Sequence, residues 1–207
     1  MIDPLGGPAY WWPFAVGFVV AYLIGSVPFG LILTRIAGAG DLRAIGSGNI
    51  GATNVLRTGR KGLAIATLIL DVLKGALPVW LAGRYFGPDM AVVAGLGAVV
   101  GHCFPVWLKF LGGKGVATAL GVVVVLTPLA ALIAVVLFIA ITALTRYVSL
   151  GSILAAASTC VVAYLLGHVQ AAELYLALAA LITAKHAGNI RRLLTGTEAK
   201  LGAGGSP

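Results

Sequence analysis

A glycine-rich segment of this 207-residue chain combines residue types that bind phosphate groups. Residues 46–57 read Gly-Ser-Gly-Asn-Ile-Gly-Ala-Thr-Asn-Val-Leu-Arg. Glycines let backbone N–H groups converge on an oxyanion, and hydroxyl and amide side chains add neutral donors. The candidate ligands are Ser47, Asn49, Gly51, Thr53, Asn54 and Arg57, whose guanidinium matches phosphate oxygens. A flexible loop with one arginine would account for the same segment without any chemistry.

A second segment, residues 110–118, reads Phe-Leu-Gly-Gly-Lys-Gly-Val-Ala-Thr and follows Gly101-His102. A glycine-rich turn that opens a helix directs N–H groups and the positive end of the helix dipole at an anion. We therefore expect a phosphate cradle made by Gly112, Gly113, Lys114 and Gly115. It is not a Walker A motif, because the required earlier glycine is missing. A tight turn with a lysine extending to the membrane surface is the alternative. His102 fits a structural role as well as a catalytic one.

The third segment, residues 186–198, reads His-Ala-Gly-Asn-Ile-Arg-Arg-Leu-Leu-Thr-Gly-Thr-Glu. His186, Asn189 and Arg192 are spaced by three residues, so on a helix they share one face. An imidazole, an amide and a guanidinium in one line suit a phosphorylated substrate. A basic helix that binds lipid headgroups is the plainer interpretation. Glu198 is expected to be a structural partner of an arginine.

Two charged residues, Asp71 and Lys74, lie inside an apolar run. Charges within a membrane mark functional sites by default. Opposite charges three residues apart can neutralise each other, however, so we expect a structural pair. Ser149 and Ser152 follow a turn at Arg146 and could line the same site as the three segments.

The overall composition indicates that these segments belong to a membrane protein. Hydrophobic residues make up 60% of the chain, charged residues 10%, and the mean hydropathy is +1.04. Soluble domains average about 25% charged residues. The formal charge of +8 lies in short loops between apolar runs, which favours membrane orientation and anionic ligands over nucleic acid. Cys103 and Cys160 lie inside apolar runs and predict buried free thiols.

The apolar runs predict an all-α bundle of transmembrane helices. They fall at about 14–36, 63–83, 90–108, 116–144, 148–167 and 171–184. The fourth is too long for one span of about 20 residues, and a break at Thr127-Pro128 would divide it. Seven spans then place 12 of the 14 lysines and arginines on one side, which the positive-inside rule makes cytoplasmic. We expect the N-terminus outside, the C-terminus in the cytoplasm, and a short helix 116–126 that neighbouring helices shelter.

Residues 1–198 are predicted to form a single integral-membrane domain, and residues 199–207 a disordered tail. The N-terminus lacks the positive region of a cleaved signal peptide, so we expect an uncleaved first span with Trp11 and Trp12 at the membrane interface. Three scattered histidines and few carboxylates make a poor ligand set, so no metal is expected.

The three segments resemble the motifs of the PlsY family of bacterial acyl-phosphate:glycerol-3-phosphate acyltransferases. The matching patterns are Ser-Gly-Asn-Ile-Gly-Ala-Thr-Asn-x-x-Arg, Gly-His-x-x-Pro with Phe-x-Gly-Gly-Lys-Gly-Val-Ala-Thr, and His-x-x-Asn-Ile-x-Arg-Leu-Leu-x-Gly-x-Glu. The resemblance implies transfer of an acyl group from a long-chain acyl phosphate to sn-glycerol 3-phosphate. The products would be 1-acyl-sn-glycerol 3-phosphate (lysophosphatidic acid) and phosphate, in the first acylation of bacterial phospholipid synthesis. It also implies a place among inner-membrane lipids, an active site facing the cytoplasm, and no cofactor.

The resemblance also assigns roles to individual residues. It carries the family's essential residues onto Ser47, Arg57, His186 and Asn189, its glycerol-phosphate glycines onto Gly112, Gly113 and Gly115 beside Lys114, and its glutamate onto Glu198. We expect Lys114, Arg57 and the loop amides to hold phosphates, and Ser47, Thr53, Asn54 and Asn189 to bind substrate oxygens. His186 would orient the attacking hydroxyl or take its proton. The leaving phosphate could accept that proton instead, so both roles stay open.

Two other functions fit parts of the pattern. A transporter of a phosphorylated metabolite would explain the basic loops and the intramembrane Asp71 and Lys74, but it needs polar groups near the membrane midplane and access from both sides. A lipid-binding scaffold would not need His186 and Asn189 in register with a phosphate cradle. The sequence does not indicate the oligomeric state.

Overall fold

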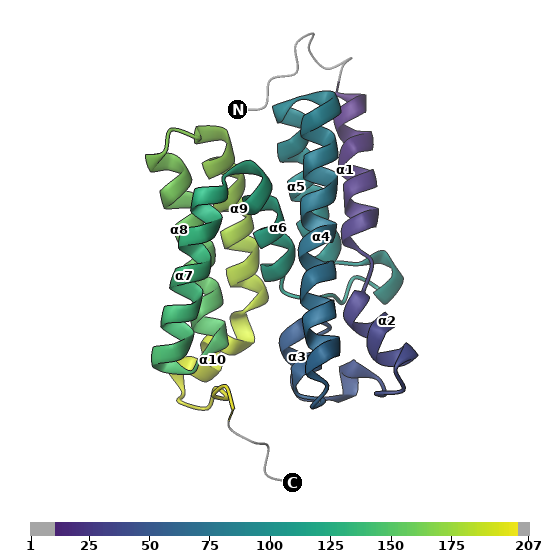
Figure 1. Ribbon diagram of the computed structural model, residues 1–207, viewed down its shortest axis with the longest axis vertical. Coiled ribbons are helices and arrows are strands. Elements are labelled where there is room, and N and C mark those ends of the chain that lie inside the picture. The colour runs from purple at the N-terminus through teal and green to yellow at the C-terminus, as the bar shows by residue number, and fades with distance from the viewer. Residues whose placement is uncertain (1–10, 203–207) are drawn as a thin grey trace. The chain divides into compact units, whose positions relative to one another are not determined.

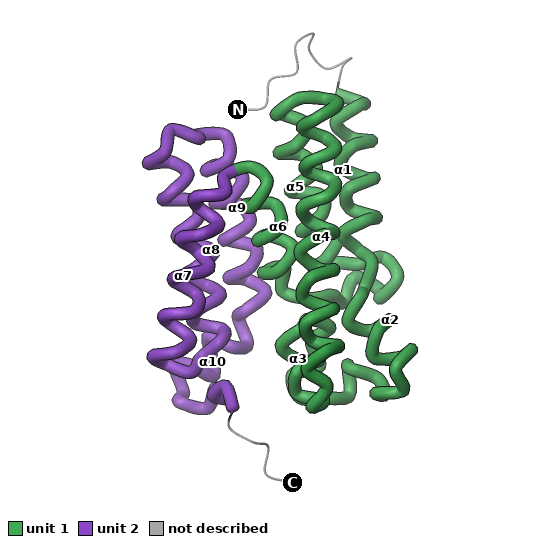
Figure 2. The backbone as a smooth tube through the Cα atoms, viewed as in Figure 1, with its two compact units in different colours: residues 1–126 green, residues 127–207 purple. Residues whose placement is uncertain are grey.

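The computed structural model describes residues 11–202, which are helical with no strand in that range. The α-helices of Figure 1 are α1 (Trp12–Gly25), α2 (Phe29–Ile36), α3 (Ala52–Leu56), α4 (Lys61–Phe86), α5 (Pro88–Cys103), α6 (Val116–Leu126), α7 (Pro128–Thr145), α8 (Val148–Leu165), α9 (Val169–Lys185) and α10 (Ala187–Leu194). Short 3-10 helices cover Leu42–Ala44 and Val106–Leu108. The chain divides into two compact units, residues 1–126 and 127–207 (Figure 2).

Five helical segments within residues 11–202 are long and apolar enough to cross a membrane. They are Trp12–Ile36, Lys61–Phe86, Pro88–Leu108, Pro128–Thr145 and Val148–Leu165. The expected all-α multi-pass membrane bundle is therefore confirmed. Helices α6 and α9, with 11 and 17 residues, are shorter than these five. The count of seven spans and the orientation of the chain stay predictions.

The first span, expected as one apolar helix, is interrupted between α1 and α2. Proline lacks an N–H group and cannot continue a helix, and Pro28 stands directly before α2. The Ser26 hydroxyl donates to the Leu23 carbonyl at 2.8 Å and satisfies part of the end of α1. The carbonyl of Val27, released from the helix, accepts a hydrogen bond from Lys74 on α4.

The predicted break at Thr127-Pro128 is present. Helix α6 ends at Leu126 and α7 begins at Pro128, because proline suits the first position of a helix. Thr127 is buried and its hydroxyl shares a hydrogen bond of 2.6 Å with the hydroxyl of Tyr175 on α9. This bond anchors the beginning of the second unit to one of its own helices.

Helix α6 packs closely against α4 in the first unit, in keeping with the shelter expected for so short a segment. A Cβ atom on Gly75 would collide with the carbonyl oxygen of Thr118, and one on Gly121 with that of Val72. Small residues allow two membrane helices to approach until their backbones touch. The glycine of each helix therefore faces the backbone of the other.

In the second unit α7, α8 and α9 pack in sequence, and α10 continues from α9 (Figure 1). Arg146 turns the chain between α7 and α8 with a left-handed backbone (φ 63°). The predicted tail returns to this turn. Leu201 donates its N–H to the Arg146 carbonyl at 2.7 Å, and its own carbonyl accepts from the Arg146 guanidinium. Residues 203–207 of that tail lie outside the described residues.

Candidate active site

Asn54 of α3 holds the first predicted segment together. Its side chain is 2% exposed, and its oxygen accepts the N–H of Ser47 at 3.1 Å. Its amide nitrogen contacts the carbonyl oxygens of Leu42, Ile45 and Asn49 at 2.9 to 3.0 Å. These bonds satisfy backbone groups of a loop that lacks the regular hydrogen bonds of a helix or sheet. A substrate contact was predicted for Asn54, and its side chain here bonds four backbone groups of the loop.

The loop around Asn54 presents Ser47 and Arg57 together. Both residues are exposed. The Arg57 side chain folds back over Gly46, the neighbour of Ser47, where a Cβ atom would lie 2.9 Å from the Arg57 Cδ and 3.1 Å from its Nη1. Gly46 has a φ of 55°, which suits glycine. A guanidinium that lies beside the neighbour of a serine can bind the same phosphate group as that serine's hydroxyl.

The remaining polar residues of this segment lie around the first turn of α3. The side-chain oxygen of Asn49 accepts the N–H of Gly51 at 3.1 Å, a local turn that precedes α3. Thr53 is exposed on that helix. Of the six candidate ligands, Ser47, Thr53 and Arg57 are therefore the ones that reach solvent most openly.

Replacement of Asn54 by alanine is expected to lower the free energy of unfolding by about 3 kcal/mol, because several buried backbone groups lose their partner. Thermal unfolding in detergent measures this effect. Thr58→Ala is the matched control, since it removes one hydroxyl that donates to Val55 in the same segment. Unchanged stability in Asn54→Ala would return Asn54 to the substrate contact that the sequence predicted.

The second predicted segment leads directly into α6, as expected. Gly115 is buried, has a φ of 84°, and its carbonyl accepts the N–H of Ala119 in the first turn of α6. Gly113 is buried as well and donates its N–H to the His102 carbonyl at 3.0 Å. Lys114 stands half-buried between these glycines. The loop thus places a lysine at the N-terminus of a helix, an arrangement that attracts anions.

Asp71 and Lys74 form the predicted pair. Lys74 Nζ lies 2.7 Å from Asp71 Oδ1, and both side chains are almost fully buried. A buried charge is tolerated when it is paired and hydrogen-bonded.

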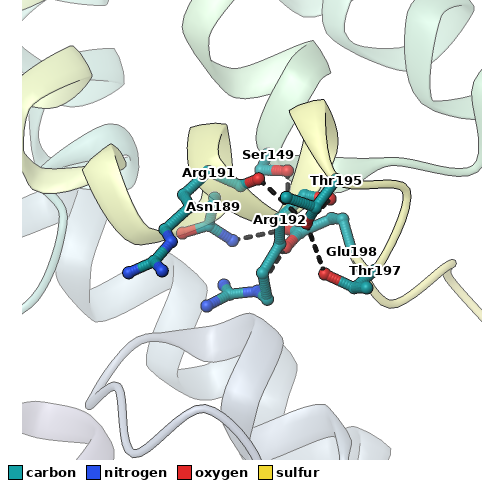
Figure 3. A network of polar contacts seen from close by, with 7 residues as sticks. All are labelled: Ser149, Asn189, Arg191, Arg192, Thr195, Thr197 and Glu198. Atoms are coloured by element: carbon teal, nitrogen blue, oxygen red, sulfur yellow. Dashed lines mark hydrogen bonds and ion pairs between the residues drawn. The ribbon is translucent and has the colours of Figure 1, made fainter.

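In the second unit a single carboxylate gathers the polar residues of the third segment (Figure 3). Glu198 Oε1 accepts hydrogen bonds from the Ser149 hydroxyl, at 2.7 Å, and from the Asn189 amide. Glu198 Oε2 accepts from Arg192 Nε at 2.7 Å. The expected pairing of Glu198 with an arginine is confirmed, as is the common face of Asn189 and Arg192.

The two serines of α8 were predicted to line the site, and both have hydrogen-bonded hydroxyls in the second unit. Ser149 is buried and its hydroxyl donates to Glu198. Ser152 is buried too, and its hydroxyl donates to the Val148 carbonyl of its own helix at 2.8 Å. Ser149 acts through the Glu198 network, and Ser152 satisfies its hydroxyl within α8.

His186 stands at the junction of α9 and α10. It is 2% exposed, and its Nδ1 lies 2.8 Å from the Ile182 carbonyl one turn earlier in α9. A carbonyl only accepts hydrogen bonds, so Nδ1 is the protonated nitrogen that donates in this contact. The ring therefore turns back along α9, while Asn189 and Arg192 turn toward Glu198.

The pKa of Glu198 lies below its ordinary value of 4.5. Burial raises it, but the hydrogen bonds from Asn189, Ser149 and Arg192 together lower it further than burial raises it. A depressed pKa contributes stability above the unfolded pKa, and that contribution is lost as the pH falls through the folded value.

Glu198→Gln is expected to be less stable than the wild type at about pH 7 and to approach it at about pH 3.5. The carboxylate that the network binds is charged at the first pH, and at the second, below its ordinary pKa of 4.5, a larger share of it is protonated, first of all in the unfolded chain. Thermal unfolding of both proteins at the two pH values measures the gap. A gap of equal size at both values would show that the charge of Glu198 does not stabilise the network.

The predicted site residues therefore form one group in each unit. The first unit holds Ser47, Arg57 and the Gly112–Gly115 loop, and the second holds His186 and the Glu198 network. Within residues 11–202, no three His, Cys, Asp or Glu side chains gather so as to hold a metal ion. The contact between His102 and Gly113 was not predicted from the sequence. Its only local signal is the Gly-His-x-x-Pro pattern shortly before the glycine-rich loop.

Comparison with known proteins gives a consistent match. A family model described as glycerol-3-phosphate acyltransferase matches residues 15–196. The glycerol-3-phosphate acyltransferase of Methylorubrum populi is 54% identical over 195 residues, 94% of this chain and 96% of that protein. The protein of the same name from Mesorhizobium japonicum is 56% identical over 190 residues, 92% of this chain and 97% of its own length.

Two solved structures also match. One is the crystal structure of PlsY (YgiH), an integral membrane glycerol 3-phosphate acyltransferase, in its glycerol 3-phosphate form. It gives a TM-score of 0.87 at 41% identity and covers 92% of this chain and 96% of that chain. The lysophosphatidic acid form of the same protein gives a TM-score of 0.86 at 40% identity, with equal coverage.

Proposed function

Because this chain belongs to the glycerol-3-phosphate acyltransferase family, we propose that its acyl donor is a long-chain acyl phosphate. The acceptor is glycerol 3-phosphate, and the product is lysophosphatidic acid. Both proposed substrates carry a phosphate, so the enzyme needs two places where anions bind beside a region that accepts an acyl chain. The observation that carries the proposal is the Gly112–Gly115 loop, which sets Lys114 at the N-terminus of α6.

The proposed phosphate ligands are Lys114, Arg57 and the N–H groups of the glycine-rich loop, with Ser47 and Thr53 as neutral donors. Ser47 and Arg57 are both exposed, and the Arg57 side chain lies beside Gly46, the neighbour of Ser47, which supports this assignment. In the second unit Asn189 donates its amide N–H to Glu198, and we propose it as the residue that hydrogen-bonds a substrate oxygen there. Arg192 contributes to this arrangement by holding Glu198.

The proposed chemistry is one displacement at the acyl carbon. The 1-hydroxyl oxygen of glycerol 3-phosphate attacks the carbonyl carbon, a new ester bond forms, and the bond from that carbon to the phosphate oxygen breaks. The hydroxyl proton passes to His186 Nε2 or to the departing phosphate. The enzyme contributes mainly by positioning both substrates and by stabilising negative charge on the phosphate.

The proposed topology has seven spans, with α6 and α9 completing the five longer ones. The N-terminus then lies outside, and most lysines and arginines lie in the cytoplasm with the active site. Each unit carries residues that the family motifs make essential. We therefore propose that residues 1–198 act as one catalytic domain within the inner membrane.

The test is release of inorganic phosphate by the purified protein from a long-chain acyl phosphate, with and without glycerol 3-phosphate. Release that requires glycerol 3-phosphate, and that collapses in Ser47→Ala, is the expected result. Mass analysis should find one lysophosphatidic acid per phosphate. Uptake of a phosphorylated metabolite into sealed vesicles without any acyl product would overturn the proposal in favour of transport.

A further inference from the structure

A buried charged cluster lies behind the glycine-rich loop in the first unit. It consists of Asp71, Lys74 and His102, each at most 4% exposed. Lys74 Nζ contacts Asp71 Oδ1 at 2.7 Å and donates to the Val27 carbonyl at 2.8 Å. The same ammonium lies 5.6 Å from the ring centre of Phe29. Lys74 therefore neutralises Asp71 and ties α4 to the break between α1 and α2.

His102 connects this cluster to the loop. Its Nδ1 lies 3.8 Å from Asp71 Oδ1, an electrostatic contact and not a hydrogen bond. On the other side of the ring, a Cβ atom on Gly113 would collide with His102 Nε2 and lie 2.9 Å from the two adjoining ring carbons. The His102 carbonyl also accepts the N–H of Gly113. Gly113 therefore contacts His102 in two ways. Its N–H donates to the His102 carbonyl, and the His102 ring occupies the position that a Cβ atom of residue 113 would take.

Helix α4 supports the other end of the loop as well. Gly75, one residue after Lys74, packs against the carbonyl of Thr118 in the first turn of α6. Helix α4, which carries Asp71 and Lys74, thus contacts the beginning of α6 directly. It contacts the preceding loop through His102 of α5. The position of the loop amides depends on both contacts.

We propose that His102 is a positioning residue for glycerol 3-phosphate: held at Asp71 in the buried cluster, its ring sets the place of Gly113 and so of the loop amides and Lys114. The inference rests on the proposed function of the loop as the glycerol phosphate site. Groups that bind a phosphate must be held to within about 0.5 Å of their working positions. The His102 ring occupies the Cβ position of Gly113, so it can fix the place of the loop without touching the substrate.

The first test is His102→Ala, assayed by initial rates of phosphate release with each substrate varied in turn. We expect the KM for glycerol 3-phosphate to rise about tenfold or more, with kcat within about threefold and the KM for acyl phosphate unchanged. Val99→Ala is the matched control, because Val99 is a fully buried residue of α5, the helix that carries His102, and lies outside the cluster. It should lose stability and keep both KM values.

The second test uses the collision between Gly113 and His102. Gly113 has no positive φ, and the three atoms nearest to a Cβ atom there all belong to the His102 ring, so Gly113→Ala drives a methyl group into that ring. We expect this single variant to raise the KM for glycerol 3-phosphate strongly. Adding His102→Ala removes the ring, so the double variant should have a lower KM than Gly113→Ala alone. A His102 ring that does not set the position of Gly113 would not produce this recovery.

The outcomes separate the inference from the function on which it rests. Wild-type protein that releases no phosphate in response to glycerol 3-phosphate contradicts the proposed function. Active wild type combined with a His102→Ala variant that only unfolds more easily, or raises both KM values equally, overturns the positioning role. Additive effects of His102→Ala and Gly113→Ala would overturn it too. If His102→Ala does not fold, His102→Asn takes its place in both tests, because it lacks the Nε2 edge that Gly113 contacts and keeps a polar side chain in the buried cluster.

Discussion

Replacement of Lys114 by alanine is expected to lower kcat/KM by at least about 100-fold. Lys114 is the one full charge in the Gly112–Gly115 loop, and it stands half-buried at the N-terminus of α6. A charge in such a place is screened less by water and salt than one on an open surface. Its loss should appear at subsaturating glycerol 3-phosphate, where initial rates of phosphate release measure it.

Lys109→Ala is the matched control for this prediction. Lys109 lies on the same connection between α5 and α6, but it is exposed. Because it is also a lysine, its replacement by alanine changes the net charge by the same amount. We expect kcat/KM within about twofold of the wild type. Lys114→Arg should retain part of the activity, because it keeps the charge and changes the geometry. Equal losses in Lys109→Ala and Lys114→Ala would mean that only the overall basic surface matters.

The local grouping of the candidate phosphate ligands was predictable from the sequence, because phosphate binding requires particular residue types close together in the chain. Arg57 and Ser47 are ten residues apart, and the Arg57 side chain lies against Gly46, the neighbour of Ser47. Lys114 stands between Gly113 and Gly115 in the chain. Local sequence could not tell which polar side chains turn inward, however. Thr53 and Asn54 are adjacent and both polar, yet one is exposed and the other holds the loop.

The same division between local and distant contacts explains the fold. The break at Thr127-Pro128 was predictable because an apolar run of that length, with its flanking charges, demands one. The interruption between α1 and α2 was not predicted. The carbonyl released there is bound by Lys74, 47 residues further along the chain. Asp71 and Lys74 pair within one helical turn and were predicted, whereas His102, which joins them from α5, depends on packing between helices.

Gly75→Ala is expected to lower the midpoint of thermal unfolding by roughly 5–10 °C, which corresponds to about 3 kcal/mol of overpacking. The added methyl group would run into the carbonyl of Thr118, a backbone group that cannot rotate away. Helix α6 would have to move off α4, and its first turn follows the glycine-rich loop directly. Thermal unfolding in detergent and the KM for glycerol 3-phosphate should therefore both change.

Gly83→Ala on the same helix provides the comparison that gives this result its meaning. A Cβ atom there meets only the Ala91 side chain, at an ordinary contact distance of 3.4 Å. Alanine is favoured over glycine within a helix by about 1 kcal/mol, so this variant should be as stable as the wild type or more so. Equal losses at Gly75 and Gly83 would show that α4 tolerates no added methyl group anywhere. A loss confined to Gly75 would place the constraint at the crossing of α4 and α6, where the phosphate loop meets its helix.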